Sequence, residues 1–269
     1  MSFINVFKKE VRWNLKAFLI WTAIFVAFAL MYIPITDQML QRSDEIIKLL
    51  DMMPKFIRQM FNLEEELLTR PEGIFGSEGM SFVYILSAVF SSMLAGSLFA
   101  KEFEQKTIEY LIVKPGSRVT VFLSKSLVMI LYLVALSAVF VFSITRLFDI
   151  FVNASYNQTI LLGFGLYALS VQMFFAGVAT IVAVIGQKSS LNISVSIGLV
   201  IFMYFGDTLS NSFEVISWVG KLSVFHYIPL VKTIVEERVV VGNSILIMLL
   251  SLGLLAIGML IFRKVDVKV

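Results

Sequence analysis

The sequence contains no cysteine and a single histidine, His226, among 269 residues. The lack of cysteine excludes disulfides, thiolate metal sites and cysteine nucleophiles, and any histidine-based metal site or catalytic triad would depend on His226 alone. Charged residues are scarce, at 15% of the chain, against about 25% in an ordinary soluble domain. Hydrophobic residues make up 58%, which is more apolar surface than a water-soluble fold of this size buries. These values indicate a polytopic membrane protein.

Six apolar runs are long enough, or nearly so, to cross a bilayer as helices of roughly 20 residues. They cover residues 17–35, 80–100, 119–145, 159–185, 189–206 and 239–262. We therefore expect an all-α fold with six transmembrane helices in a single transmembrane domain over residues 1–269.

The loops differ in charge from one side of the membrane to the other. Six spans place both termini on one side, where Lys and Arg outnumber Asp and Glu, whereas acids are in excess on the other side. Because basic loops stay inside the cell, we expect both termini in the cytoplasm. In a membrane protein this distribution is more informative than the net charge of +3, and no nucleic-acid partner is expected.

The six runs hold no acidic residue, and Lys125, near the start of the third, is their only charged one. Its side chain is expected to reach back to the membrane surface. Ion-coupled transporters rely on ionisable groups near the middle of the bilayer, and a phosphate-binding G-x-x-x-x-G-K-[ST] loop is also missing. Any transport energy is thus expected to come from another chain.

Three segments outside the spans have patterns of their own. Residues 2–16 predict a basic amphipathic helix at the inner membrane surface. The long outer loop 36–79 predicts amphipathic helices that either rest on the outer leaflet or form an external gate. Residues 207–238, which include His226, predict short re-entrant helices that dip back into the outer leaflet before the last span.

Residues 101–118, KEFEQKTIEYLIVKPGSR, are highly charged although they lie between two long apolar runs. Apolar and charged residues alternate there at helical spacing, and Pro115-Gly116 then breaks the chain. The pattern predicts either a short helix that docks a soluble partner or a solvated loop.

The same segment resembles the six-span permeases of bacterial type-2 ABC exporters, in the drug, peptide or exotoxin group. The family pattern A-x-E-x-E, G-T-x-E-x-L-L and P-x-S-R is matched, with Lys106 where glycine is common. The matching residues are Glu102, Phe103, Glu104, Thr107, Ile108, Glu109, Tyr110, Leu111, Lys114, Pro115 and Arg118. The stretch 222–227 is similar to the S-P-x-H-Y segment of the family, with Val224 in place of proline.

This resemblance implies a bacterial cell-membrane exporter with two copies of a cytoplasmic ABC ATPase, which would bind ATP and Mg; the permease chain itself would carry no cofactor. It also implies a second permease protomer, identical or different, facing the second and fifth spans. A coupling helix from about Phe103 to Ile112 would sit in a cleft of the ATPase, and Glu102 and Glu104 would pair with basic residues there. The cargo would be hydrophobic or amphipathic: a peptide, an antibiotic or a lipid-like molecule.

The walls of the expected path are uncharged and rich in Phe, Met and Ile, which favours apolar cargo. Membrane lipid is expected to surround the chain. The residues expected to line it are Phe90, Met93, Phe99, Ile197, Phe202 and Phe205. Two alternatives remain: an ATP-independent channel or carrier, and a membrane protein that transports nothing, such as an immunity or sensory subunit.

Overall fold

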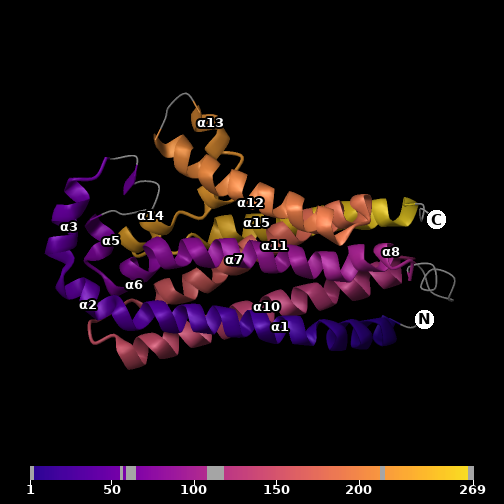
Figure 1. Ribbon diagram of the computed structural model, residues 1–269, viewed down its shortest axis with the longest axis horizontal. Coiled ribbons are helices and arrows are strands. Elements are labelled where there is room, and N and C mark those ends of the chain that lie inside the picture. Colours follow the sequence, from indigo (N-terminus) through magenta and orange to yellow (C-terminus); the bar gives the residue numbers. More distant parts are fainter. Residues whose placement is uncertain (1–2, 55–56, 59–64, 108–117, 213–215, 266–269) are drawn as a thin grey trace.

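The computed structural model describes residues 3–54, 57–58, 65–107, 118–212 and 216–265, and in these residues the chain forms helices but no strand. Six helical stretches in this part of the chain are long and apolar enough to cross a membrane (Figure 1). Their main helices are α1 (Phe3–Tyr32), α7 (Met80–Ala95), α10 (Arg118–Phe151), α11 (Gln158–Gly186), α12 (Ser189–Ser212) and α15 (Val241–Lys264). The predicted all-α architecture with six spans is confirmed.

The two ends of the helix bundle differ in what they carry. The beginning of α1 and the end of α15 lie at the same end, together with α8 (Lys101–Glu104), and we call this the terminal end (Figure 1). The opposite, distal end holds short helices: α2 (Thr36–Gln41), α3 (Ser43–Asp51), α5 (Glu65–Leu68), α6 (Pro71–Ile74), α13 (Ser217–Gly220) and α14 (Leu230–Val235). The two termini therefore lie at one end, as the count of six spans predicts.

Residues 3–16 do not form the separate interfacial helix that the sequence predicts. Helix α1 continues without a break from Phe3 to Tyr32. Its buried stripe in the first turns is Val6, Glu10 and Asn14, whereas the apolar side chain of Leu15 is 44% exposed. The expected interfacial helix is corrected in this respect, because the polar side chains of Glu10 and Asn14 find partners inside the bundle.

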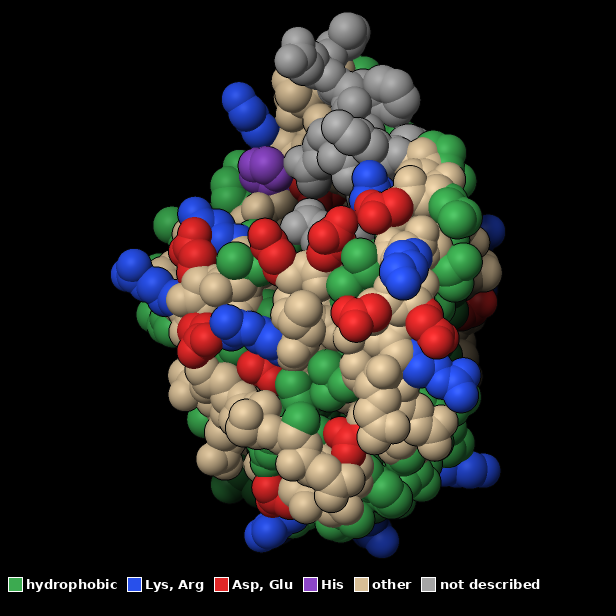
Figure 2. Space-filling view, turned by 90° about the vertical axis from the view of Figure 1, so that its left-hand side faces the viewer, with side chains coloured by type: hydrophobic (Ala, Val, Ile, Leu, Met, Phe, Trp, Pro, Cys, Tyr) green, Lys and Arg blue, Asp and Glu red, His purple; other side chains and the backbone are tan. Residues whose placement is uncertain are grey.

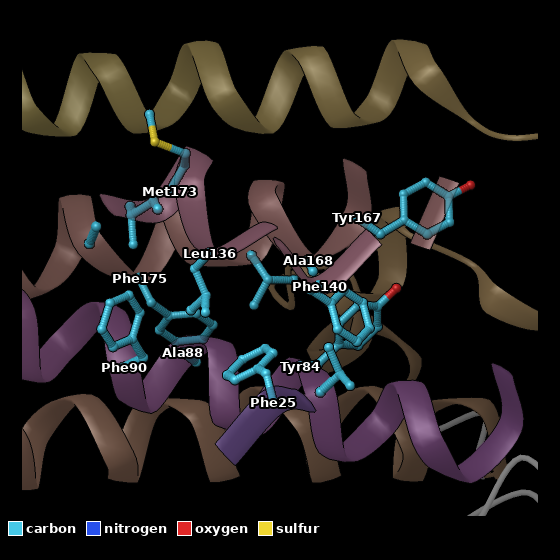
Figure 3. Close-up of a cluster of buried hydrophobic side chains, with 14 of the residues drawn as sticks. Phe25, Tyr84, Ala88, Phe90, Leu136, Phe140, Tyr167, Ala168, Met173 and Phe175 are labelled. Atoms are coloured by element: carbon cyan, nitrogen blue, oxygen red, sulfur yellow. The ribbon is translucent and has the colours of Figure 1, made fainter. Parts of the chain in front are cut away.

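Helices α7 and α11 form the centre of the bundle, and both have more of their surface buried than the other spans. Their side chains meet those of α1 and α10 in one apolar cluster, in which Phe25, Phe90, Phe140 and Phe175 are at most 1% exposed (Figure 3). Phe25 and Phe140 meet edge to face with ring centroids 5.8 Å apart, a favourable geometry for aromatic pairs. This core fixes α7 and so positions the charged segment that follows it.

Helix α7 continues into that segment through a π-helical turn, η3 (Gly96–Ala100), and then α8. Together these elements form one helical stretch from Met80 to Glu104 that is long and apolar enough to cross a membrane. Wide π turns interrupt the regular ladder of hydrogen bonds and are common near functional sites. Here the turn brings Leu98 and Glu102 toward α10.

The distal helices pack on one another and on the bundle. Leu50, Leu68 and Ile74 form a small second core, with Ile46 and Ile47 packed against it, so the helical stripe predicted in the outer loop is confirmed for α3. After α12 the chain forms α13, the short 3-10 turn η5 (Phe225–Tyr227) and α14. These helices correspond to the segment for which re-entry into the membrane is expected.

Candidate functional site

A cluster of four charged side chains lies inside the bundle at its terminal end. Lys125 of α10 is its centre and is 1% exposed, although the sequence predicts that it reaches the membrane surface. That expectation is wrong because Lys125 has partners inside. Its Nζ lies 2.8 Å from Oε1 of Glu10 and 3.1 Å from Oε2 of Glu102, and it donates to the carbonyl oxygen of Leu98 at 2.7 Å.

The fourth member is Lys9, whose Nζ lies 3.7 Å from Oε1 of Glu102 and 4.0 Å from the centre of the Trp13 ring. Two lysines thus balance two glutamates. This balance matters because an unpaired charge in a low-dielectric interior is very costly. The cluster ties α1, α8 and α10 together.

Glu102 is held less firmly than Glu10, the other glutamate of this cluster. It is 5% exposed, yet within the described part of the chain neither of its carboxylate oxygens accepts a hydrogen bond of good geometry. Its two contacts with lysines are ionic only. Glu10, in contrast, accepts a 2.8 Å hydrogen bond from Lys125. A displacement of α8 would therefore change the contacts of Glu102 before those of Glu10.

The position of Glu102 corrects its expected role. The resemblance implies that it pairs with basic residues of an ATPase, but in this structure it is buried against Lys125 and Lys9. Phe103 also faces inward, is 8% exposed, and packs edge to face with Phe262 at 6.0 Å. Glu104 is exposed and accepts a hydrogen bond from the backbone nitrogen of Ser189 at 3.4 Å.

The helix that contains Phe103 ends at Glu104 and does not run on unbroken toward Ile112 as expected. The backbone nitrogen of Lys106 donates to the carbonyl of Phe103, and that of Thr107 donates to the carbonyl of Glu102, both at 3.0 Å. These two bonds make a Schellman cap, in which one residue takes a left-handed conformation. That residue is Lys106, with φ of 56°.

This left-handed residue gives a physical reason for the glycine that the family pattern has at the position of Lys106, since glycine adopts positive φ without steric cost. Of the other predicted coupling residues, Arg118 caps α15 by donating to the carbonyls of Arg263 at 3.1 Å and Val265 at 2.9 Å. Ile108, Glu109, Tyr110, Leu111, Lys114 and Pro115 lie outside the described residues.

The residues expected to line a path divide into two groups. Phe90 and Phe99 are 1% exposed and belong to the core of the chain itself, so they do not reach a surface that a second protomer could face. Met93, Phe202 and Phe205 are 41%, 57% and 43% exposed, and Ile197 is half-buried. Most of the exposed path residues therefore come from α12.

Sequence reasoning missed Lys9, Glu10 and Lys125 as members of one site. The available signal was Lys125 itself, because an ionisable residue within an apolar span is a functional candidate with a partner to be found. The partner acids went unrecognised because Glu10 and Glu102 lie outside the predicted spans 17–35 and 80–100. In the structure both belong to helices that continue the spans.

The fold and this cluster together define a class: a multi-pass helical membrane protein whose spans are joined by buried charges at one end. Within that class, residues 10–263 match the family model described as multidrug efflux system permease Rv1217c, C-terminal domain. The chain belongs to this family, and its membership supports a role as a transport permease. A search of curated proteins finds no match.

Proposed function

We propose that the chain is the permease subunit of an ATP-driven exporter and that a separate ATPase, present in two copies, docks on residues 101–118. The observation that carries the proposal is the position of α8. Its exposed side, Lys101 and Glu104 with the following Lys106, faces away from the bundle at the terminal end, while Glu102 in the same helix enters the ion cluster. One short helix thus links an accessible charged surface to the interior.

The terminal end is cytoplasmic in this proposal, because its loops carry the excess of Lys and Arg. A partner that binds there can displace α8 as a unit. Because Glu102 is held by charge alone, its displacement changes the contacts of Lys125 on α10 and of Lys9 on α1. The cluster then passes movement of the ATPase to two spans at once.

The cargo path is proposed between two permease protomers, with α12 contributing most of its wall. The apolar side chains of Phe202 and Phe205 are exposed there, and lipid would cover them in a single chain. The described residues of α12 from Ser189 to Phe205 carry no charge, which favours hydrophobic or amphipathic cargo, in agreement with a family described as a multidrug efflux permease.

A purification experiment tests the ATPase partner. The tagged chain is extracted from its native membrane in mild detergent, and accompanying proteins are identified and counted. We expect an ATPase in equal amount, and we expect its loss when Glu104→Lys and Lys106→Glu are combined, since this exchange reverses the order of charge on the exposed side. Lys8→Glu, an exposed change at the same end on α1, is the matched control and should keep the ATPase.

Two results would contradict the proposal. Export of a drug by reconstituted chain alone, without nucleotide, would identify an ATP-independent carrier. A chain that purifies without any ATPase and changes the export of no compound when deleted would identify a subunit that does not transport.

A further inference from the structure

A cavity of about 440 Å³ lies at the distal end of the bundle. It is formed by α7, by the end of α12 and by the chain from Phe225 to Glu236, with Glu66 of α5 at its side. Ligand pockets have volumes of roughly 300–1,000 Å³, so this cavity has room for a small organic molecule. It lies within one chain, and its lining includes none of the residues expected to line the path between protomers.

Three aromatic rings from separate elements form one wall of the cavity. Tyr84 of α7 stacks on Phe225 with ring centroids 5.6 Å apart. Tyr204 of α12 meets Phe225 edge to face at 5.7 Å. The faces of aromatic rings carry negative charge density and attract cations, so this wall favours a positively charged ligand with an apolar body.

Acidic side chains in the lining add to this preference. Glu66, Asp207 and Glu236 are part of it, whereas Lys232 is its only lysine among the described residues and pairs with Glu236 at 3.7 Å. Asp207, whose side chain is 18% exposed, contacts Nδ1 of His226 at 3.1 Å. Figure 2, which views the distal end, shows acidic side chains distributed over this surface among basic ones.

The hydroxyl group of Tyr84 provides an independent observation. Tyr84 is 2% exposed, and among the described residues its oxygen has no hydrogen-bond partner. A buried polar atom without a partner is costly. Because Tyr84 belongs to the lining of the cavity, a bound molecule that carries a hydrogen-bonding group, such as an ammonium N–H, can satisfy this oxygen.

We propose that this cavity binds an amphipathic organic cation. The positive charge lies near Asp207 and the aromatic wall, and the apolar body contacts Ile228 and Leu230, which also line the cavity. Cation binding in this cavity adds to the proposed function, and its relevance to export rests on that function. It gives the cargo a positive charge and places a holding site inside each chain, at the end opposite the ATPase.

Tetraphenylphosphonium, which has no hydrogen-bonding group, probes the preference of the cavity for positive charge and an apolar body, and tetraphenylborate is its counterpart of similar shape and opposite charge. The full chain, with any subunit that accompanies it, is placed in lipid nanodiscs without nucleotide. Binding of each probe is measured by equilibrium dialysis against empty nanodiscs. We expect saturable binding of the cation and at least about tenfold weaker binding of the anion.

Two variants assign the binding to the cavity. Asp207→Asn preserves shape and should weaken cation binding about tenfold, because it removes a negative charge close to the bound cation. Val235→Trp, at a lining residue that is 39% exposed, should block the cavity without disturbing the core. The matched control is Asp44→Asn, an exposed acid of α3 outside the lining, which should bind as the unchanged chain does.

Equal binding of both probes, or a cation affinity that neither Asp207→Asn nor Val235→Trp lowers, would overturn the proposal. The test separates this inference from the proposed function because it uses no nucleotide. A chain that binds the cation in the cavity but has no ATPase partner contradicts the proposed function alone. A chain that purifies with an ATPase but lacks the cation site contradicts the cavity proposal alone.

Discussion

The Nζ atom of Lys125 lies 2.8 Å from Oε1 of Glu10, although the two residues are 115 positions apart and their side chains are only 1% and 3% exposed. This pair joins α10 to the first turns of α1 inside the bundle. It explains why α1 continues into the bundle from Phe3 and does not lie across the membrane surface. The buried charges hold the helices together where apolar packing in lipid provides little driving force.

Removing one partner of this pair should strongly destabilise the chain. Lys125→Met keeps the length of the side chain but leaves Glu10 and Glu102 buried without their shared cation. Breaking a buried ion pair costs about 3–5 kcal/mol, and we expect a loss of this size in the free energy of unfolding. Titration with sodium dodecyl sulfate in mixed micelles measures it.

Lys8→Met is the control for this prediction, because Lys8 is exposed on the same part of α1. It should change the unfolding free energy by less than about 0.5 kcal/mol. The triple variant Lys125→Met, Glu10→Gln, Glu102→Gln should recover part of the loss, since no buried glutamate is left without a cation and Lys9, whose side chain is 27% exposed, reaches solvent. Equal stability of Lys125→Met and Lys8→Met would show that the cluster does not hold the bundle.

The left-handed residue of the helix cap after α8 gives a prediction of opposite sign. Lys106 has φ of 56°, and a side chain in this region costs roughly 1–2 kcal/mol, which glycine avoids. Lys106→Gly should therefore stabilise the chain by about 1 kcal/mol in the same titration. Lys106→Ala removes the charge but keeps Cβ, and it should have little effect; a gain equal to that of the glycine variant would disprove the conformational explanation.

Close packing of α11 on α15 gives a further prediction. A Cβ atom at Gly177 would lie 3.1 Å from the carbonyl oxygen of Ser251 and 3.0 Å from Cβ of Leu254. Gly177→Leu should therefore push the helices apart and cost about 1–3 kcal/mol. Gly253→Leu is the matched control on α15, because no atom lies within 4 Å of a Cβ built there.

Thermal unfolding in detergent compares these two leucine variants. Each variant replaces one glycine of a span by leucine, so a difference between them measures the close contact between α11 and α15 at Gly177. The account predicts a lower unfolding temperature for Gly177→Leu only. An equal loss in both variants would attribute the effect to the spans in general.

The six spans could be predicted from the sequence because long uninterrupted apolar runs have few other structures available to them. The helical stripe of α3 could also be predicted from the sequence, since Ile46, Ile47 and Leu50 recur at helical spacing. The sequence did not predict that α1 continues without a break from Phe3 into the bundle. Its basic residues are typical of an interfacial helix, and only the three-dimensional position of Lys125 shows why Glu10 is buried.

The candidate site divides in the same way. The sequence indicates that residues 101–118 form a charged segment, but it does not distinguish Glu102, which faces the core, from Glu104, which is exposed. That distinction depends on the π turn η3 and the cap at Lys106, both of which set the direction of α8. The distal cavity combines residues from four separate stretches of chain, and no local pattern predicts such a combination.

The central proposal is that an ATPase docks on residues 101–118. Because the sequence contains no cysteine, single thiols can be introduced to test this docking directly. Gln105→Cys introduces one thiol at an exposed position after α8, and Ser155→Cys introduces one at an exposed position of the distal end. A short bifunctional thiol–amine reagent is added to native membranes, and the joined proteins are identified by mass spectrometry. The account predicts that Gln105→Cys is joined to a nucleotide-binding subunit and Ser155→Cys is not. No such product from Gln105→Cys, or equal products from both positions, would contradict it.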